Sequence, residues 1–413
     1  MVGSRGRPSL FTMSALQAAP PVPRRRVALY SHDTQGLGHV RRNIEIARAL
    51  LAERPDTDVL LLSGAPEAAR LPRPEQAGLV VLPSVSKSRS GEYAATQPGL
   101  GLAEVLRLRG AMVASAIEHF RPDVLVVDKE ARGLRGELDP ALAVARRTTG
   151  AGGRRTRLVL GLRDVLDTPL TARREWESAG TTRTLRSSYD AVWVYGDPRV
   201  HDLGDACGLP RDVRAMMRFT GYLAEGRHHG PRATYADGAP YVLCLVGGGQ
   251  DGADLADAFV RAPLPRGHRG VVVTGPYMPR AARDALDVLA GTRDDLSVLG
   301  FVDDTPGLID GAAAVVTMGG YNTVCELLAS GRPGLVVPRV VPRLEQAVRA
   351  DELARRTHLD ALHPDEASAD AVGAWLADAV GRDGGAHDLD LGGLTRLPAL
   401  LDQLLEEIDD ATA

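Results

Sequence analysis

The stretch that decides the fold is residues 317–346, TMGGYNTVCELLASGRPGLVVPRVVPRLEQ. It predicts a strand, a turn at Gly319-Gly320, a short helix that carries Glu326, a second strand, and a helix that begins near Glu345-Gln346. Two glycines at a strand-to-helix turn let backbone N–H groups approach an anion, and the helix dipole adds to the attraction. The carboxylates and the amide offer partners to sugar hydroxyls. The stretch therefore indicates a site for a nucleotide sugar.

Length and composition set the class of protein. A chain of 413 residues suggests two domains, and 44% hydrophobic with 25% charged residues is typical of a soluble α/β protein. The net charge of −4 provides no basic field for nucleic acid. No apolar run approaches the roughly 18 residues of a membrane span, and the three cysteines lack metal or disulfide spacing. We therefore expect a cytoplasmic protein without a transmembrane segment.

The N-terminal half opens with a strand–turn–helix unit. The strand Val27–Tyr30 runs into Gly36-Leu37-Gly38-His39, and a helix with apolar residues at helical spacing follows. The dinucleotide fingerprint G-x-G-x-x-G is absent because Arg41 stands where its third glycine would be, which argues against hydride transfer. His39 ends the glycine turn and is a candidate functional residue; a helix cap is the plain alternative.

Apolar runs recur through this half, which predicts a mostly parallel sheet with helices on both faces. Functional residues of such sheets lie just past the strand ends, a rule that selects His39, Asp128-Lys129-Glu130 and Arg163-Asp164. The alternatives are a helix cap or a pair with Lys129 for Asp128, and a local ion pair for Arg163-Asp164. The predicted strands are 59–62, 79–82, 124–127, 158–160 and 191–194, with a mobile loop at 84–98 and an amphipathic helix at 102–120.

A second strand–turn–helix unit begins the C-terminal half. The strand Tyr241–Val246 runs into Gly247-Gly248-Gly249-Gln250, which suits a phosphate-contacting turn. Phe301-Val302, just past another strand, is suited to hold a nucleobase by stacking and backbone hydrogen bonds. Asp303-Asp304 is not a D-x-D metal motif and is expected to cap the next helix, so we expect no bound metal. Further strands are predicted at 270–274, 296–299, 314–317 and 334–337.

Glu326 also has a purely structural interpretation. Thr323 and Glu326 have the spacing of a capping box, and Gly331 with Pro333 ends the helix. Capping does not account for the double glycine before the helix, or for Glu345-Gln346 at the next strand end. The combination favours a ligand site.

At these residues the sequence resembles GT-B glycosyltransferases, in particular the family of peptidoglycan (undecaprenyl-muramyl-peptide) N-acetylglucosaminyltransferases and related bacterial enzymes. The resemblance extends over about residues 27–362 and is strongest at the two glycine turns and in the block from Gly300 to Gln346. No stretch matches the membrane-binding apolar patch of the peptidoglycan enzymes, and residues 319–323 differ from their corresponding motif. We therefore expect a different acceptor.

The resemblance implies a GT-B fold, in which two Rossmann-like, doubly wound parallel-sheet domains face a cleft. It implies that the C-terminal domain binds the nucleotide-sugar donor and that the N-terminal domain binds the acceptor. The glycine turns would bind the diphosphate, Phe301-Val302 the base, Glu326 the ribose, and Glu345-Gln346 the donor sugar. The expected nucleotide-sugar-binding residues are Gly36, Gly38, Gly247, Gly248, Gly249, Gln250, Phe301, Val302, Gly319, Gly320, Asn322, Thr323, Glu326, Glu345 and Gln346, and Arg163 and Asp164 are expected in the acceptor cleft.

The implied activity is an inverting, metal-independent transfer of a sugar to an acceptor hydroxyl. UDP is favoured as the nucleotide of the donor, with dTDP and GDP open, and no cofactor is expected. His39 is the first candidate for the general base and Asp128 the second. The alternatives are a nucleotide-sugar 2-epimerase of the same fold, against which the Gly-x-Gly-His turn argues, and a non-catalytic nucleotide-sugar sensor.

The expected organisation follows from the same patterns. The partners are a nucleotide sugar and an unidentified acceptor, with no nucleic acid; a monomer, a homodimer and peripheral contact with a membrane all stay open. We expect a disordered leader at 1–23, which lacks the apolar core of a signal peptide, an acceptor-binding domain at 24–221, a linker at 222–240, a nucleotide-sugar-binding domain at 241–395, and a C-terminal helix and tail at 396–413.

Overall fold

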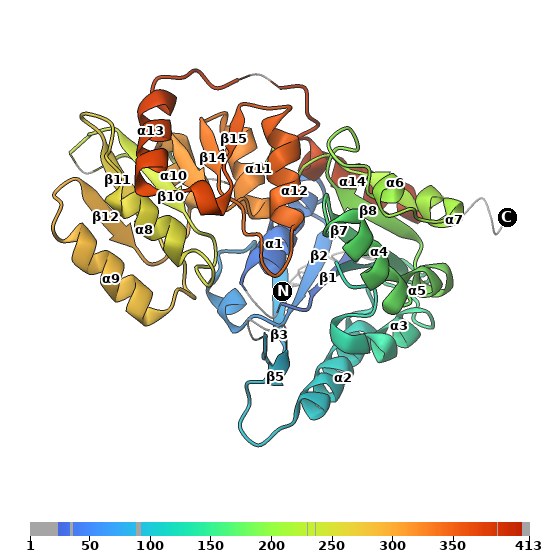
Figure 1. Ribbon diagram of the computed structural model, residues 1–413. Helices are drawn as coiled ribbons and strands as arrows, with labels where there is room; N and C mark the ends of the chain where they lie inside the picture. Colours follow the sequence, from blue (N-terminus) through green and yellow to red (C-terminus); the bar gives the residue numbers. More distant parts are fainter. Residues whose placement is uncertain are drawn as a thin grey trace, which may run out of the picture.

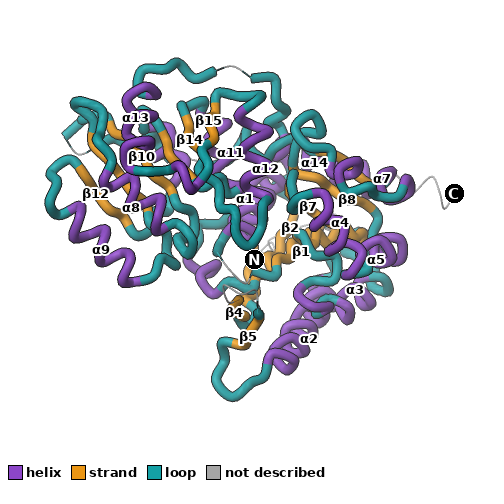
Figure 2. The backbone as a smooth tube through the Cα atoms, in the orientation of Figure 1, coloured by secondary structure: helices purple, strands orange, loops and turns teal. Residues whose placement is uncertain are grey.

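The computed structural model describes residues 24–33, 36–87, 92–228, 230–235, 237–385 and 387–406. The expected leader at 1–23 and the end of the expected tail lie outside the described residues. Within the described ranges, the chain forms two parallel sheets and a small antiparallel hairpin. Figure 2 shows the strands of the two sheets in separate bodies, each surrounded by helices.

The N-terminal sheet has seven strands in the described part of the chain, in the order β3-β2-β1-β6-β7-β8-β9. The neighbours of β1 pair with it in parallel, so that Leu29 lies opposite Leu61 on one side and Val126 on the other. The strands are β1 (Arg25–Ser31), β2 (Thr57–Ser63), β3 (Ala77–Val81), β6 (Val124–Asp128), β7 (Arg157–Arg163), β8 (Ala191–Tyr195) and β9 (Met217–Phe219). The helices are α1 (Gly38–Glu53), α2 (Leu102–Phe120), α3 (Asp139–Ala145), α4 (Pro169–Ser178), α5 (Thr181–Ser188), α6 (Leu203–Ala206) and α7 (Arg211–Ala215).

The C-terminal sheet has six strands among the described residues, in the order β12-β11-β10-β13-β14-β15. In both sheets the strand order reverses beside the first strand of the domain, β1 or β10, while all strands stay parallel. A crevice forms at such a switch point, outside the carboxyl ends of the strands. The strands are β10 (Tyr241–Leu245), β11 (Arg269–Val273), β12 (Leu296–Leu299), β13 (Val315–Thr317), β14 (Gly334–Val336) and β15 (Leu359–Ala361). The helices are α8 (Ala253–Arg261), α9 (Arg280–Ala290), α10 (Thr305–Gly311), α11 (Tyr321–Ser330), α12 (Glu345–Ala354) and α13 (Ala369–Ala379).

These two doubly wound sheets confirm the predicted fold class. The helix predicted at 102–120 is α2 with the same bounds. The prediction of a loop at 84–98 was wrong in part, because β4 (Val85–Lys87) and β5 (Tyr93–Ala95) pair there as an antiparallel hairpin. The short strands β9 and β15 were not predicted, since three residues carry too little pattern to be recognised.

The chain crosses between the two bodies twice. The first crossing follows β9, and the second follows α13 and leads to α14 (Gly393–Glu406). Figure 1 shows α14, in red, among the green elements of the N-terminal domain. Leu397 and Leu401 of α14 share a buried cluster with Ile44 and Leu51 of α1. The C-terminal helix therefore completes the N-terminal domain.

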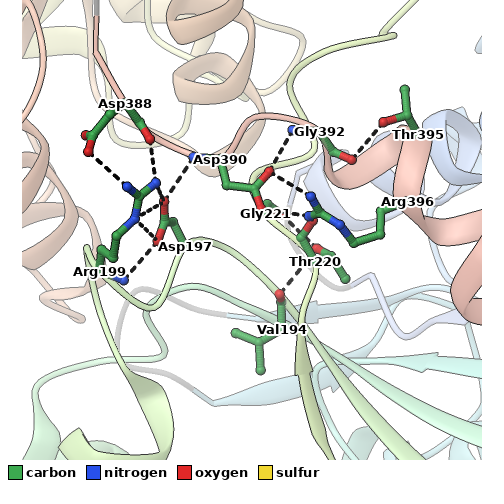
Figure 3. A network of polar contacts seen from close by, with 10 residues as sticks. All are labelled: Val194, Asp197, Arg199, Thr220, Gly221, Asp388, Asp390, Gly392, Thr395 and Arg396. Atoms are coloured by element: carbon green, nitrogen blue, oxygen red, sulfur yellow. Dashed lines mark hydrogen bonds and ion pairs between the residues drawn. The ribbon is translucent and has the colours of Figure 1, made fainter.

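The two crossings lie side by side and are tied by charged side chains (Figure 3). Leu223 of the first forms an antiparallel bridge with Gly392 of the second. Arg199, after β8, donates to Asp388 Oδ2 at 2.9 Å. Asp390 accepts from Arg396 of α14 at 2.7 Å. These contacts fix the return segment to the N-terminal domain.

Candidate active site

A cleft of about 310 Å³ lies between the two domains, at the carboxyl ends of the strands in both sheets. The N-terminal domain contributes the first glycine turn and the residues that follow β6 and β7. The C-terminal domain contributes both of its glycine turns and the start of α12. Of the predicted site residues, those that line the cleft are Gly36, Gly38, His39, Arg163, Gly247, Gly248, Gly249, Gln250, Phe301, Val302, Gly320, Asn322, Thr323, Glu345 and Gln346.

At Gly249, the glycine turn after β10 leaves no space for a side chain. Gly249 has a φ of +90°, and a Cβ there would lie 2.1 Å from the carbonyl oxygen of Thr274. The neighbouring turn after β11 closes against it, because the Tyr277 N–H donates to the Gly248 carbonyl at 2.9 Å. The close packing holds the backbone of the turn at the cleft wall, where its N–H groups can approach an anion.

The turn after β13 leads into α11 one residue after Gly320, which is its N-cap. No side chain caps this helix, so its first N–H groups are left for a ligand. The capping-box interpretation of Thr323 and Glu326 was wrong, because the helix begins at Tyr321, three residues earlier than that pattern requires. Gly331, in the left-handed region at φ 66°, ends the helix as predicted.

His39 lies in the first turn of α1 and faces the cleft. Its Nδ1 is 3.0 Å from Oδ2 of Asp128, the last residue of β6. Arg42, one turn further along α1, donates to Asp128 Oδ1 at 2.6 Å. Burial alone would raise the pKa of Asp128, but Arg42 and His39 hold that pKa well below its ordinary value. Asp128 is therefore a permanent carboxylate.

Asp128 does not line the cleft, and only 1% of its surface is exposed. The structure thus places the second candidate base behind the first. A carboxylate on Nδ1 fixes the ring orientation of a histidine and favours the tautomer whose Nε2 is free to accept a proton. Asp128 can orient His39 but cannot reach a substrate in the cleft.

Asp164 was predicted in the acceptor cleft, but it is buried in an ion pair between the domains. Arg349 of α12 donates to it at 2.8 Å through Nε and at 2.6 Å through Nη2. Tyr222 Oη donates to its Oδ2 at 3.1 Å. Burial would raise the pKa of Asp164, but Arg349 lowers it. Asp164 therefore joins the domains, whereas its neighbour Arg163 does line the cleft.

Glu326 lies one layer behind the cleft wall. Its Oε2 accepts from Thr305 Oγ1 at 3.0 Å, and its Oε1 lies 3.3 Å from Arg227 Nη1. Glu326 lines a smaller cavity of about 180 Å³, and Thr305 lines both this cavity and the larger cleft. Burial raises the pKa of Glu326 despite the opposing effect of Arg227. A ribose that contacted Glu326 would have to approach from the side of Thr305.

Glu345 and Gln346 start α12, and Arg339 fixes both. Arg339 Nη2 donates to Glu345 Oε1 at 2.8 Å, and the Arg339 backbone N–H donates to Gln346 Oε1 at 3.0 Å. Burial would raise the pKa of Glu345, but Arg163 and Arg339 lower it. A carboxylate and the amide nitrogen of Gln346 thus face the cleft in a fixed arrangement.

Phe301 has the exposure expected of a stacking platform, since 43% of it is accessible. The guanidinium of Arg41 lies 6.0 Å from its ring centroid, at the outer limit of a cation–π contact. Asn322 joins the two walls beside it, because its Nδ2 donates to the Gly38 carbonyl at 2.8 Å. Gly319 alone of the glycines predicted in that turn does not line the cleft. A Cβ there would lie 2.5 Å from Val336.

Residues 243–370 match the family described as the glycosyltransferase family 28 C-terminal domain. A relative over most of the chain is the UDP-N-acetylglucosamine–N-acetylmuramyl-(pentapeptide) pyrophosphoryl-undecaprenol N-acetylglucosamine transferase of Leuconostoc mesenteroides. It is 21% identical over 329 residues, which cover 73% of this chain and 76% of the relative. The chain is a glycosyltransferase related to these peptidoglycan N-acetylglucosamine transferases.

Solved structures support the GT-B fold of this glycosyltransferase. The glycotransferase of kitacinnamycin superposes with a TM-score of 0.55 at 17% identity, covering 95% of this chain and 99% of that one. A structure from Listeria monocytogenes assigned as a UDP-N-acetylglucosamine 2-epimerase gives a TM-score of 0.56 at 14% identity, covering 94% and 98%. At these identities the likeness concerns the fold alone.

Sequence reasoning missed several residues that shape the glycosyltransferase site, namely Arg42, Arg339, Arg343 and Arg349. It selected Lys129 by its place after a strand end but assigned it no role in the site. Two of these residues could have been recognised from the sequence pattern. Arg42 and Arg349 stand among the apolar positions that face the core in α1 and α12, and both are almost fully buried. An arginine on a buried helix face needs an anionic partner, so each predicts a carboxylate opposite.

Two properties bear on partners. Across the described ranges, no three His, Cys, Asp or Glu side chains are grouped so as to hold a metal ion. Nor does any helix in those ranges combine the length and apolarity that a membrane crossing requires.

Proposed function

We propose that this glycosyltransferase moves a sugar from a nucleoside-diphosphate sugar, with UDP favoured, to an acceptor hydroxyl, with inversion and without a metal ion. The observation that carries the proposal is the placement of His39, oriented by Asp128, in the same cleft as the two glycine turns of the C-terminal domain. A base and an anion site on opposite walls are what an in-line displacement needs.

The C-terminal wall would stabilise the leaving diphosphate. Negative charge grows on the diphosphate as its bond to the sugar breaks, and fixed backbone N–H groups can stabilise that charge without reorganisation. The turn at Gly247–Gly249 and the uncapped start of α11 provide such groups. The helix dipole of α11 adds a partial positive charge at the same place. We therefore assign the diphosphate to these two turns.

The rest of the donor follows from that placement. Phe301-Val302 would hold the base, and Glu345-Gln346 would bind the hydroxyls of the sugar. The ribose hydroxyls would reach Glu326 through the side of the cleft where Thr305 stands between the two cavities. Domain contact through Asn322 and Gly38 would exclude the water that otherwise hydrolyses the donor.

The N-terminal wall would supply the base. With Nδ1–H donated to Asp128, Nε2 of His39 can accept the proton of the acceptor hydroxyl as that oxygen attacks the sugar carbon. Asp128 then stabilises the imidazolium that forms, as the carboxylate of a hydrolase triad does. Both residues come from rigid elements, α1 and the end of β6, which keeps the base at a fixed distance from the sugar.

A 2-epimerase is the competing function, because one superposed structure carries that assignment. Such a reaction would require additional acidic and basic carboxylates around the sugar. Of the described lining residues, the carboxylates are Asp251 and Glu345, and Arg339 binds both, at 3.1 and 2.8 Å. An ion pair with Arg339 makes each a weaker proton donor, which favours transfer over epimerisation.

Thermal-shift screening of the full chain with UDP, dTDP and GDP sugars tests the donor assignment. A donor that binds only the folded state stabilises it by mass action, by about 2.7 kcal/mol at a hundred times its dissociation constant, and so raises the melting temperature. We expect the UDP sugars to give the largest shift. No shift with any nucleotide sugar would contradict the proposed function.

A further inference from the structure

Three cationic side chains line the same cleft as His39. Lys129 follows β6, Arg163 ends β7, and Arg343 precedes α12. They are close enough to influence one another: burial lowers the pKa of Lys129, and the charges of Arg343 and Arg163 lower it further. Like charges that lie this close repel one another, and such groups with perturbed pKa values occur mainly at functional sites.

Arg163 is the centre of this group. Its guanidinium forms no ion pair or hydrogen bond with any described residue, and its Nε is buried. Burial lowers the pKa of Arg163 to about 10, an unusual value for a guanidinium. By contrast, two buried arginines of the helices are paired, since Arg42 of α1 and Arg349 of α12 each bind a buried carboxylate. A half-buried cation at a cleft wall, with no ion pair to a described residue, fits a site that an anion completes.

Lys129 adds a second observation. Its φ of 70° lies in the left-handed region, which costs a lysine about 1 kcal/mol or more. The backbone is held there by a hydrogen bond from the Lys129 N–H to the Gly161 carbonyl at 2.7 Å. A strained residue at a strand end, with its side chain at the cleft, is typical of a functional position.

The nearby acids pair with Arg343 but leave Arg163 and Lys129 only partly neutralised. Glu175 binds Arg343 at 2.8 Å, with Asp167 at 3.5 Å. Glu130 lies 3.4 Å from the Lys129 ammonium but has a side chain that is 41% exposed, so water screens its charge. Glu345 forms its ion pair with Arg339, and the charge of Arg163 also lowers the pKa of Glu345, so Glu345 offsets part of the Arg163 charge without binding it. Arg163 and Lys129 thus keep a large part of their charge for a ligand.

We propose that Lys129 and Arg163, with Arg343 beside them, bind an anionic group of the acceptor, a phosphate or a carboxylate, next to the hydroxyl that His39 deprotonates. The proposal rests on the proposed glycosyl transfer and narrows its acceptor to anionic compounds. A planar guanidinium binds either anion through two parallel N–H bonds, and an ammonium adds a point charge.

The position of the cations favours the acceptor over the donor. Lys129 and Arg163 belong to the N-terminal wall, on the two strands that follow β1 in the sheet, and Lys129 directly follows the residue that orients His39. The donor diphosphate has its own backbone site on the opposite wall, at the glycine turns. Two separate anion sites then flank the transferred sugar.

Calorimetric titration of the full chain tests the proposal. The protein is saturated with UDP, which fills the donor site, and inorganic phosphate is titrated in, with malonate in a parallel titration. We expect at least one of the two anions to bind, and its identity distinguishes a phosphate from a carboxylate on the acceptor. Arg163→Met and Lys129→Met should each weaken binding at least tenfold. Arg280→Met, at an exposed arginine of α9, should leave the affinity unchanged.

The melting temperature separates a binding role from a structural one. Because Arg163 forms no ion pair or hydrogen bond with a described residue, the melting temperature of Arg163→Met should equal or exceed that of the unmodified chain. The proposal is overturned if neither anion binds the UDP-saturated protein, if binding persists in both variants, or if Arg163→Met melts markedly lower. Because anion binding needs no turnover, it can fail or succeed independently of the nucleotide-sugar screen.

Discussion

Replacing Arg349 by methionine should strongly destabilise the contact between the two domains. Arg349 and Asp164 are 0% and 1% exposed at their side chains, and the guanidinium makes short contacts to both carboxylate oxygens. The pKa of Asp164 is lowered, so the carboxylate remains charged at neutral pH. Methionine fills similar space but leaves that charge buried and uncompensated.

The magnitude follows from the burial of both partners. Loss of one partner of a buried ion pair costs about 3–5 kcal/mol. At about 2–4 °C per kcal/mol for a domain of 150–250 residues, the melting temperature should fall by about 6–20 °C. Arg355→Met, at an exposed arginine of the same helix that pairs with Glu352, is the matched control and should cost less than about 1 kcal/mol.

Differential scanning fluorimetry and urea unfolding measure these losses. The double variant Asp164→Asn/Arg349→Met removes both charges and keeps an acceptor for the Tyr222 hydroxyl, so it should recover at least half of the loss. A loss below about 1 kcal/mol for Arg349→Met would refute the reasoning. So would a double variant whose loss equals the sum of the two single losses, because the pair would then not be coupled.

Three further predictions concern the cleft and its charges. Asp128→Asn should lower kcat by about 10²–10⁴-fold, because His39 loses its orientation, while the thermal shift with UDP stays unchanged. Gly249→Ala should abolish that shift, because its Cβ would lie 2.1 Å from the Thr274 carbonyl oxygen. Since the pKa values of Asp128 and Asp164 are lowered in the folded state, the stability they contribute is complete above about pH 4 and is lost as pH falls through their folded values. Urea midpoints should therefore drop below about pH 4, and should drop less in Asp164→Asn/Arg349→Met.

The fold was largely predictable because its decisive features are local. Buried parallel strands read as apolar runs, and the glycine turns that follow them mark the switch points of both sheets. The hairpin of β4 and β5 could not be predicted from the sequence, since its strands have three residues each and polar residues surround them. The return of α14 to the N-terminal domain was also not readable, because it depends on contacts such as that between Asp402 and Arg25.

The candidate site was predictable in its backbone and less so in its charges. His39 and Asp128 could be selected because both follow strand ends, although 89 residues separate them. The role of Asp164 could not be deduced, since its partner Arg349 lies 185 residues further along the chain in the other domain. The sequence pattern places every strand-end carboxylate at the cleft. The packing of the two domains then determines which of these carboxylates is exposed in the cleft and which is buried in an ion pair.

The central claim is that His39 is the base of a glycosyl transfer in this cleft. The direct test is the rate of UDP release from UDP sugars, with water or an added hydroxyl compound as acceptor, in His39→Ala and in the control His119→Ala, at an exposed histidine near the end of α2. The account predicts a fall of about 10²–10⁴-fold for His39→Ala alone, with UDP binding unchanged. Normal turnover of His39→Ala with unchanged UDP binding would contradict it.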